Sequence, residues 1–520
     1  MSQEPEISVI SIIEALLDYA VDRKLVDTRD CRWARNKLLA FMELDGCEDD
    51  GCVSRLALDL PELLDALTNA ALDSGLIADG PHACDSFKAD VMDVLMPRPS
   101  QVKDRFNALL AQKGPQAACE YFYTLSCDSG YVHREAMARD IKWSLDHKWG
   151  KLEITINCSK PEKDPRAIAN ARLQDDALRF SRRYPACQLC LDNEGYAGRA
   201  DSNPHGGHPA RQNLRIADIY LGDERWALQY SPYAYYEQHC IVINRQHVPM
   251  HIDGTTFRRL LDFVDCFPQY FVGSNADLPI VGGSILNHDH FQAGLHRFPM
   301  DDAAVVQDVA LSAWPDVACG VVKWPATVLR LRSADRKQLL EAAEHILAVW
   351  QGYTDELVQI VCRDADGTPH NTITPIARKE AGEYVLDLAL RCNVTDEEHP
   401  LGVFHPHAAL HHIKRENIGL IEVMGLAILP GRLARELDAV ADALVKSATG
   451  EELLANPLTE KHAQWALEIA ARHPELSAGN VRSIIRYEVT EAFAEVLECT
   501  GVFKWDEPGR AALNRFLQSL

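Results

Sequence analysis

The chain has 520 residues, of which 47% are hydrophobic and 25% are charged, and its formal net charge is −23. One ordinary hydrophobic core does not accommodate this length, so we expect two or three domains of a globular protein. The negative charge excludes a general nucleic-acid or anionic-membrane binder, because both need a large basic surface. A small anionic substrate is compatible, since it needs only a few basic groups in one cleft.

The start of the chain and its cysteines predict a cytoplasmic protein. The first residues, MSQEPEISVISIIEALLDYAVDRK, carry acid where a secretory signal carries base. No stretch reaches the ~20 uninterrupted apolar residues of a membrane helix. Fifteen scattered cysteines, an odd number, indicate reduced thiols and not a disulfide framework.

Residues 1–110 repeat apolar residues at helical spacing, as in VISIIEALLDYAV and LPELLDALTNAAL. We expect helices here, then one further helix, and then an irregular aromatic segment at 121–131. The alternating LEITIN at 152–157 predicts a strand. Lys160, Lys163 and Arg166 follow it, and this basic loop is either a phosphate clamp or a solvated turn.

A Cys-x-x-Cys pair, Cys187 and Cys190, has ligand spacing. This spacing indicates either a redox pair or half of a tetrahedral zinc site. A metal site would need two more ligands, and histidines are the usual complement. The candidates are His239, His247 and His251 in the following strand region, and His288.

The most informative stretch is DLPIVGGSILNHDHFQAG, residues 277–294. On a strand His288, His290 and Gln292 would share one face, because alternate side chains point the same way. The preceding pair, Gly282 and Gly283, would let the oxygens of a ligand approach backbone N–H groups. A structural histidine and a simple turn are the alternative. Three polar groups on one face of an apolar strand favour a site for attack on phosphorus, because buried polar groups need partners.

Further along we expect a helix at 336–350, strands at 356–362 and 383–390, and helices from 433 to the end. A second His-x-His, His405 and His407, competes with the first as the catalytic strand. It lacks the glycine pair and the glutamine, so we rank it second.

Residues 277–292 resemble the signature of the type II galactose-1-phosphate uridylyltransferase family: DLPIVGGSI, then His-acid-His, an aromatic residue and Gln. The likeness extends to CQLCLDNEGYAGR, YSPYAYYEQHCIV and HHIKRENIGLIEVMG. It implies an α+β fold with two histidine-triad-like halves, whose largely antiparallel sheets are flanked by helices, plus a helical amino-terminal region and a helical carboxyl terminus. The implied boundaries are 1–110, 111–300 and 301–520.

The resemblance implies that uridylyl passes from UDP-glucose to an enzyme histidine and then to galactose 1-phosphate, in galactose metabolism. His290 is the implied nucleophile, and Gln292 holds the phosphoryl oxygens. Leu189 is implied to touch the uracil ring, and Ser284 to contact phosphate, although it lies one residue farther from the histidine pair than in type I enzymes. The further candidate substrate contacts are Gly282, Gly283, Lys160 and Lys163.

A structural zinc or iron ion is also implied, and no organic cofactor. Its ligands would be Cys187, Cys190, His247 and His288, and the resemblance implies a second structural metal site at His405 and His407. The segment YSPY, 230–233, stands where type I enzymes hold uridine with an asparagine. The implied partners are UDP-glucose, UDP-galactose, hexose 1-phosphates and a second copy of the chain.

Two other functions remain open. The histidine pair would also serve another nucleotidyl transfer or a nucleotide hydrolysis within the histidine-triad superfamily. Alternatively, the histidines would only bind, as in a nucleotide-sugar or metal sensor. Gln292 in place of a third histidine favours transfer.

Overall fold

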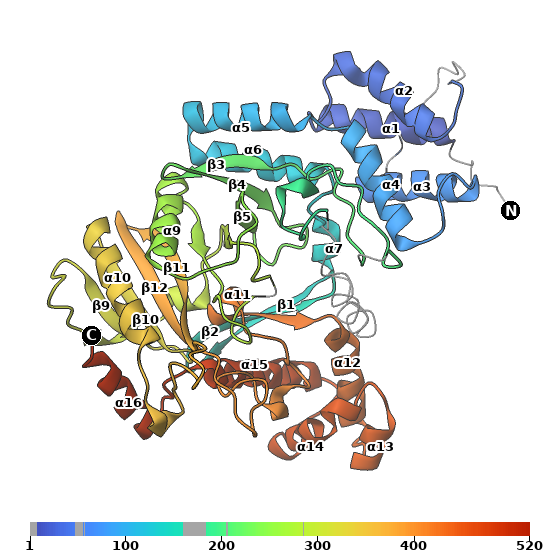
Figure 1. Cartoon of the computed structure of the whole chain (residues 1–520). Coiled ribbons are helices and arrows are strands. Elements are labelled where there is room, and N and C mark those ends of the chain that lie inside the picture. Colours follow the sequence, from blue (N-terminus) through green and yellow to red (C-terminus); the bar gives the residue numbers. More distant parts are fainter. Residues whose placement is uncertain (1–7, 47–55, 57, 160–183, 204–205, 284) are drawn as a thin grey trace.

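A ten-stranded antiparallel sheet forms the centre of the protein (Figure 1). The computed structural model describes residues 8–46, 56, 58–159, 184–203, 206–283 and 285–520. The strand order is β3-β4-β5-β7-β6-β11-β12-β10-β9-β8. The strands are β3 (Ala217–Leu221), β4 (Glu224–Tyr230), β5 (Cys240–Asn244), β6 (Phe271–Gly273), β7 (His290–Gly294), β8 (Val305–Val309), β9 (Ala318–Val322), β10 (Val328–Ser333), β11 (Asn371–Glu380) and β12 (Glu383–Cys392).

Each half of the chain supplies one half of this sheet. The first five strands in the order lie before residue 295 and the other five lie after residue 304. The two half-sheets join where β6 pairs with β11, with Gly273 opposite Ile376 and Val272 opposite Ala377. The expected α+β fold with antiparallel sheets and helical ends is therefore confirmed.

The amino-terminal region is helical, as predicted. Among the described residues, no helix is both long enough and apolar enough to cross a membrane. The helices are α1 (Val9–Asp22), α2 (Cys31–Phe41), α3 (Leu60–Asp73), α4 (Pro81–Val94), α5 (Pro99–Lys113), α6 (Pro115–Asp128) and α7 (Arg134–Ala138).

The prediction of an irregular segment at 121–131 is wrong, because most of these residues belong to α6. The buried residues Ala118, Phe122 and Leu125 recur at spacings of four and three, which places them on one helix face. The tyrosines between them obscured this period. The helix tolerates these tyrosines because their low helix propensity costs less free energy than the burial of the apolar face gains.

The second half contains α10 (Arg336–Gln351) and β12 where a helix and a strand were predicted. The prediction of a strand at 356–362 is wrong. Asp355 caps a short 3-10 helix, Glu356–Val358, by accepting a hydrogen bond from the backbone N–H of Leu357. Gln359 then has a positive φ of 59°, which interrupts an extended backbone.

The last helices, coloured orange to red, lie at the bottom of Figure 1, next to a second, three-stranded sheet. Its order is β1-β2-β13, and β13 runs parallel to β2. The predicted strand at 152–157 lies in β2, and the helices expected from 433 onward are present. The elements are β1 (Ile141–His147), β2 (Gly150–Asn157), α11 (Leu420–Val423), β13 (Leu426–Pro430), α12 (Arg432–Val445), α13 (Gly450–Ala455), α14 (Ala463–Arg472), α15 (Val481–Thr500) and α16 (Glu507–Leu517).

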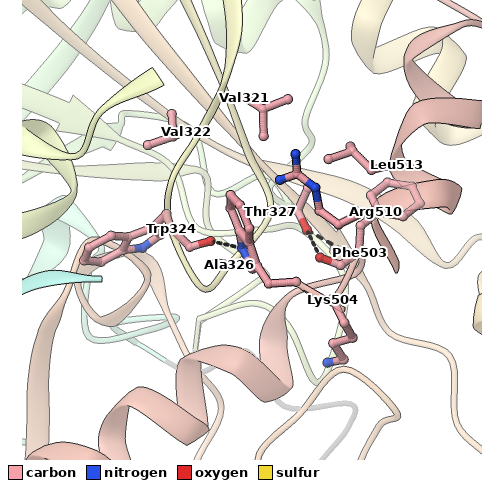
Figure 2. Close-up of a pocket in the computed structure, with 10 residues that line it drawn as sticks. Val321, Val322, Trp324, Ala326, Thr327, Phe503, Lys504, Arg510 and Leu513 are labelled. Atoms are coloured by element: carbon pink, nitrogen blue, oxygen red, sulfur yellow. Dashed lines mark hydrogen bonds between the residues drawn. The ribbon is translucent and has the colours of Figure 1, made fainter. Parts of the chain in front are cut away.

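The segment between α15 and α16 attaches the carboxyl terminus to the main sheet (Figure 2). The hydroxyl of Thr327 accepts from the backbone N–H of Phe503 at 3.0 Å and donates to its carbonyl oxygen at 3.3 Å. The indole N–H of Trp505 donates to the carbonyl oxygen of Trp324 at 2.6 Å.

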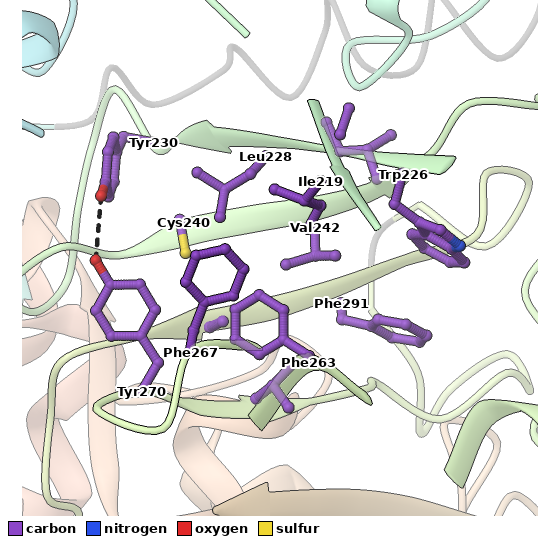
Figure 3. Close-up of a cluster of buried hydrophobic side chains, with 14 of the residues drawn as sticks. Ile219, Trp226, Leu228, Tyr230, Cys240, Val242, Phe263, Phe267, Tyr270 and Phe291 are labelled. Carbon is purple, nitrogen blue, oxygen red and sulfur yellow. Dashed lines mark hydrogen bonds between the residues drawn. The ribbon is translucent and has the colours of Figure 1, made fainter. Parts of the chain in front are cut away.

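Two hydrophobic cores lie on opposite faces of the main sheet. The first includes the α9 (Gly254–Cys266) side chain Phe263 packed near Leu228, Val242 and Phe291 of the strands (Figure 3). The second core joins the other face of the sheet to β2, α12 and α15. Side chains that point away from α9 therefore lie on the side of the second core.

A buried charge network crosses the second half-sheet. The carboxylate of Asp387, which is fully buried, accepts from Arg330 and Arg378, each at 2.7 Å. Although burial raises the pKa of Asp387, these guanidinium groups hold it below its ordinary value.

We expect Asp387→Asn to lower the free energy of unfolding by about 3 to 5 kcal/mol, because it leaves buried cations without compensation. Urea unfolding measures this loss. The control is Lys337→Gln in the exposed pair Lys337–Glu341, which should unfold like the wild type. Equal stability of Asp387→Asn and the wild type would contradict the expectation.

Candidate active site

The orientation of β7 decides which side chains form the site. Phe291 stacks on Trp226 with ring centroids 5.0 Å apart, and Ala293 is buried in the same core. Since successive side chains alternate, His290 and Gln292 point to the opposite face, away from α9. The alternation predicted for this stretch is present, but the ladder begins only at His290 and His288 precedes it.

The ring of His290 is held in one orientation by the backbone. Its Nδ1 lies 2.7 Å from the carbonyl oxygen of His288, which can only accept, so Nδ1 carries the hydrogen. Among the described residues, none hydrogen-bonds the other ring nitrogen, Nε2. Burial lowers the pKa of His290 to about 4, so the ring is neutral near pH 7.

Gln292 has a partner that the sequence did not indicate. Its Oε1 lies 3.2 Å from Nε2 of His239. The sequence indicates His239 only as a possible metal ligand, but the structure places it directly before β5, where its ring contacts Gln292 instead. No spacing rule would have found this pair, because the two residues are 53 positions apart.

Four of the predicted metal ligands come together. The potential ligand atoms of Cys187, Cys190, His247 and His288 all lie within 4.8 Å of one another. The two Sγ atoms are 3.6 Å apart, Sγ of Cys187 is 3.3 Å from Nδ1 of His288, and Sγ of Cys190 is 3.1 Å from Nδ1 of His247. Such spacings suit the edges of a tetrahedral Cys₂His₂ site with Zn–S bonds of about 2.3 Å and Zn–N bonds of about 2.0 Å.

The surroundings of the cluster also suit a metal. Nε2 of His288 donates to the carbonyl oxygen of Asn244 at 2.8 Å, and this is the usual second contact of a ligating histidine. The hydrogen bond between the thiols lowers the pKa of Cys187 to about 7 and raises that of Cys190 to about 11. Two histidines beside the thiols favour a metal site over a redox pair.

The other candidate histidines have different partners. Nδ1 of His251 lies 3.4 Å from the carboxylate of Asp277. Nε2 of His407 donates to the carbonyl oxygen of Val403, and Nδ1 of His405 lies 3.3 Å from the carbonyl oxygen of Pro406. Among the described residues, no third ligand gathers with His405 and His407, so the second metal site expected there stays a prediction.

The glycine pair lies against the segment that follows β6. A Cβ on Gly282 would collide with the carbonyl oxygens of Ala276 and Leu278, and one on Gly283 would lie 2.8 Å from Nδ2 of Asn275. Close packing therefore requires both glycines. Asn275 is a buried polar residue that the sequence analysis missed, because a single asparagine after a short strand forms no recognisable motif.

The remaining predicted contacts differ in what the structure describes. The backbone N–H of Leu189 donates to Sγ of Cys187 at 3.3 Å, and the Leu189 side chain is half-buried. Lys160, Lys163 and Ser284 lie outside the described residues.

Comparison with known proteins decides the family. The model of the galactose-1-phosphate uridyl transferase N-terminal domain matches residues 50–249, and that of the C-terminal domain matches residues 263–467. The chain belongs to the galactose-1-phosphate uridylyltransferase family. It is 45% identical over 515 residues to the galactose-1-phosphate uridylyltransferase of Bacillus subtilis (strain 168), covering 99% of this chain and 98% of that protein.

Two other members of the family match this chain over nearly its whole length. The enzyme of Halalkalibacterium halodurans is 45% identical over 515 residues, covering 99% of each chain. The enzyme of Clostridium perfringens (strain 13 / Type A) is 42% identical over 511 residues, covering 98% of this chain and 99% of that one. The chain is accordingly a transferase of this family.

We expect Cys187→Ser to lower the content of bound zinc or iron in the purified protein, because it removes one of four ligands. Elemental analysis measures the content, and thermal unfolding with and without a chelator gives an independent reading. Cys84→Ser, which changes a free cysteine outside the cluster, is the control. Metal content unaffected by Cys187→Ser would contradict the assignment.

Proposed function

We propose that the chain exchanges uridylyl between UDP-glucose and galactose 1-phosphate through a covalent intermediate on His290. The observation that carries this proposal is the 2.7 Å contact between Nδ1 of His290 and the carbonyl oxygen of His288. With the hydrogen on Nδ1, the lone pair is on Nε2, which is the nitrogen available for attack. Relatives that carry the name galactose-1-phosphate uridylyltransferase support the choice of substrates.

The two half-reactions are balanced displacements at the α-phosphorus. In the first, Nε2 of His290 forms an N–P bond while the P–O bond to the leaving phosphate breaks, and glucose 1-phosphate departs. In the second, a phosphate oxygen of galactose 1-phosphate forms a new P–O bond while the N–P bond breaks, and UDP-galactose departs. Covalent catalysis in this way divides one difficult exchange between anions into two easier steps.

Little proton transfer is needed. Nδ1 of His290 keeps its hydrogen throughout, and the carbonyl oxygen of His288 supports the positive charge that the ring gains on uridylylation. The attacking sugar phosphate is largely ionised at pH 7, since the second pKa of a phosphate monoester is about 6. Positioning and charge stabilisation therefore supply most of the catalysis.

The neighbouring residues have complementary roles. Gln292 donates from its amide to a non-bridging oxygen without adding a group that titrates. Gly282 and Gly283 bring backbone N–H groups near the phosphates, and Leu189 contacts the uracil ring. The role of Leu189 is the one that the family resemblance implies.

A zinc or iron ion would be held by Cys187, Cys190, His247 and His288 and would act as a structural cross-link, since the protein fills all four positions. His288 would then hold its own carbonyl oxygen toward His290. Thiol ligands require reduced cysteines, and the thirteen described cysteines are all free. This chemistry fits the reducing cytoplasm.

We expect His290→Ala to lower exchange activity by more than about 1,000-fold, because it removes the nucleophile. The assay incubates protein with UDP-glucose alone and measures glucose 1-phosphate. Wild-type protein should give a stoichiometric burst and an acid-labile uridylyl group on His290. The control is His251→Ala, which changes an exposed histidine and should retain the burst.

The same assay separates the alternatives. Continuing release of UMP would indicate a hydrolase, and the absence of any burst would indicate a protein that only binds. Full exchange activity in His290→Ala would overturn the covalent mechanism.

We expect Gln292→Ala to lower kcat by roughly 100 to 1,000-fold, because one donor to the phosphoryl oxygens is lost in the transition state. The KM for UDP-glucose should change far less than kcat. Steady-state kinetics measure both constants. Gln338→Ala, a surface change in the first turn of α10, is the control. An unchanged kcat for Gln292→Ala would remove this residue from the mechanism.

A further inference from the structure

We infer that His239 is a positioning residue, which holds the amide of Gln292 with its NH₂ group directed away from His239 and available to the phosphoryl oxygen. The inference rests on the function proposed above and assigns a role to a residue outside the His-x-His-x-Gln motif. The contact that carries it is the 3.2 Å distance between Nε2 of His239 and Oε1 of Gln292.

The strand register brings the side chains of His239, His290 and Gln292 to one face. Ile243 lies opposite His290, Ile241 opposite Gln292 and Cys240 opposite Ala293. His239 precedes Cys240 and thus shares a face with Ile241 and Gln292. Its ring reaches diagonally toward the Gln292 amide because the next residue of β7 on that face is Gly294, which has no side chain.

The ring of His239 has little freedom to move. It is 3% exposed, and its centroid lies 4.6 Å from that of Tyr236 and 5.4 Å from that of Tyr235. The backbone N–H of Ser231 donates to the carbonyl oxygen of His239 at 2.8 Å. A rigid donor can therefore fix the amide in advance of substrate binding.

The two ring nitrogens of His239 have unequal surroundings. Nδ1 is buried and has no hydrogen-bond partner among the described residues. Burial also lowers the pKa of His239 to about 4, so the neutral ring carries one hydrogen. Placing that hydrogen on Nδ1 would bury an N–H group without an acceptor, which is rarer in proteins than an unsatisfied acceptor.

The hydrogen therefore belongs on Nε2, from which it donates to Oε1 of Gln292. The opposite amide orientation would leave His239 without this bond and would turn Oε1 toward the negatively charged phosphoryl group. His239 thus selects the orientation in which Gln292 donates. It acts on the reaction only through Gln292.

A double-mutant cycle tests this dependence. We expect His239→Phe, which keeps the ring packing, to slow single-turnover uridylylation by UDP-glucose by roughly 10 to 100-fold, with little change in the KM for UDP-glucose. In a Gln292→Ala background the same change should have no further effect. His239→Gln, whose amide can donate to Oε1, should restore most of the rate. The control is His345→Phe, a half-buried histidine of α10 that bonds the carbonyl oxygen of Leu520.

An equal loss in both backgrounds would show that His239 acts independently of Gln292, and an unchanged rate in His239→Phe would show that it does not act at all. Either result overturns the inference while the wild-type burst stands. A failure of the proposed function would instead remove the burst from the wild-type protein.

A second test determines the tautomer of His239 in the wild-type protein. With ¹⁵N-labelled histidine, long-range ¹H–¹⁵N NMR spectra distinguish the two neutral tautomers. We expect His239, assigned by the signal that is missing in His239→Gln, to carry its hydrogen on Nε2. The Nδ1–H tautomer would overturn the inference.

Discussion

The packing of Phe291 on Trp226 determines the face that β7 presents to substrate. Burying one such side chain contributes about 1.5 to 3 kcal/mol. Because side chains alternate along a strand, a shift of one residue would bury His290 and Gln292 in the first core and expose Phe291. Burial of the apolar side chains of β7 in the first core thus directs its polar side chains to the opposite face of the sheet.

His288 links two parts of the site through different atoms. Its Nδ1 lies beside the two thiols, its Nε2 donates to the carbonyl oxygen of Asn244, and its own carbonyl oxygen receives Nδ1–H of His290. The cysteine loop and His290, the proposed nucleophile, are therefore two contacts apart. A rotation of the 288 peptide would disturb both at once.

Sequence patterns predicted the fold well wherever burial imposes a regular period. The helical ends, β2, α10 and β12 all have such a period. The pattern misled at 121–131, where tyrosines obscure a helical face, and at 356–362, where an apolar run is interrupted by a capping aspartate and a positive φ. Burial of one helix face determined the first segment. Local chain geometry, which hydrophobicity does not report, determined the second.

The site was predictable to the extent that its residues lie close together in sequence. His290, Gln292 and the four clustered ligands were recognised from short motifs and from the family resemblance. His239 and Asn275 were missed as partners of the site, because their contacts depend on how β5, β6 and β7 pair. At His405 and His407 the motif was recognised, but nearby carbonyl oxygens satisfy one ring nitrogen of each histidine.

The joint between the half-sheets has one further consequence. Gly273 lies opposite both Gln292 and Ile376, and a side chain there would press on Leu420 and on the carbonyl oxygen of Pro375. Only two residues of β6 pair across this joint, so it is the narrowest connection in the ten-stranded sheet. A twist of one half-sheet against the other would act first at Gly273, whose partner Gln292 carries the amide that we propose binds the phosphoryl group. The alignment of the two half-sheets and the alignment of this amide are therefore coupled.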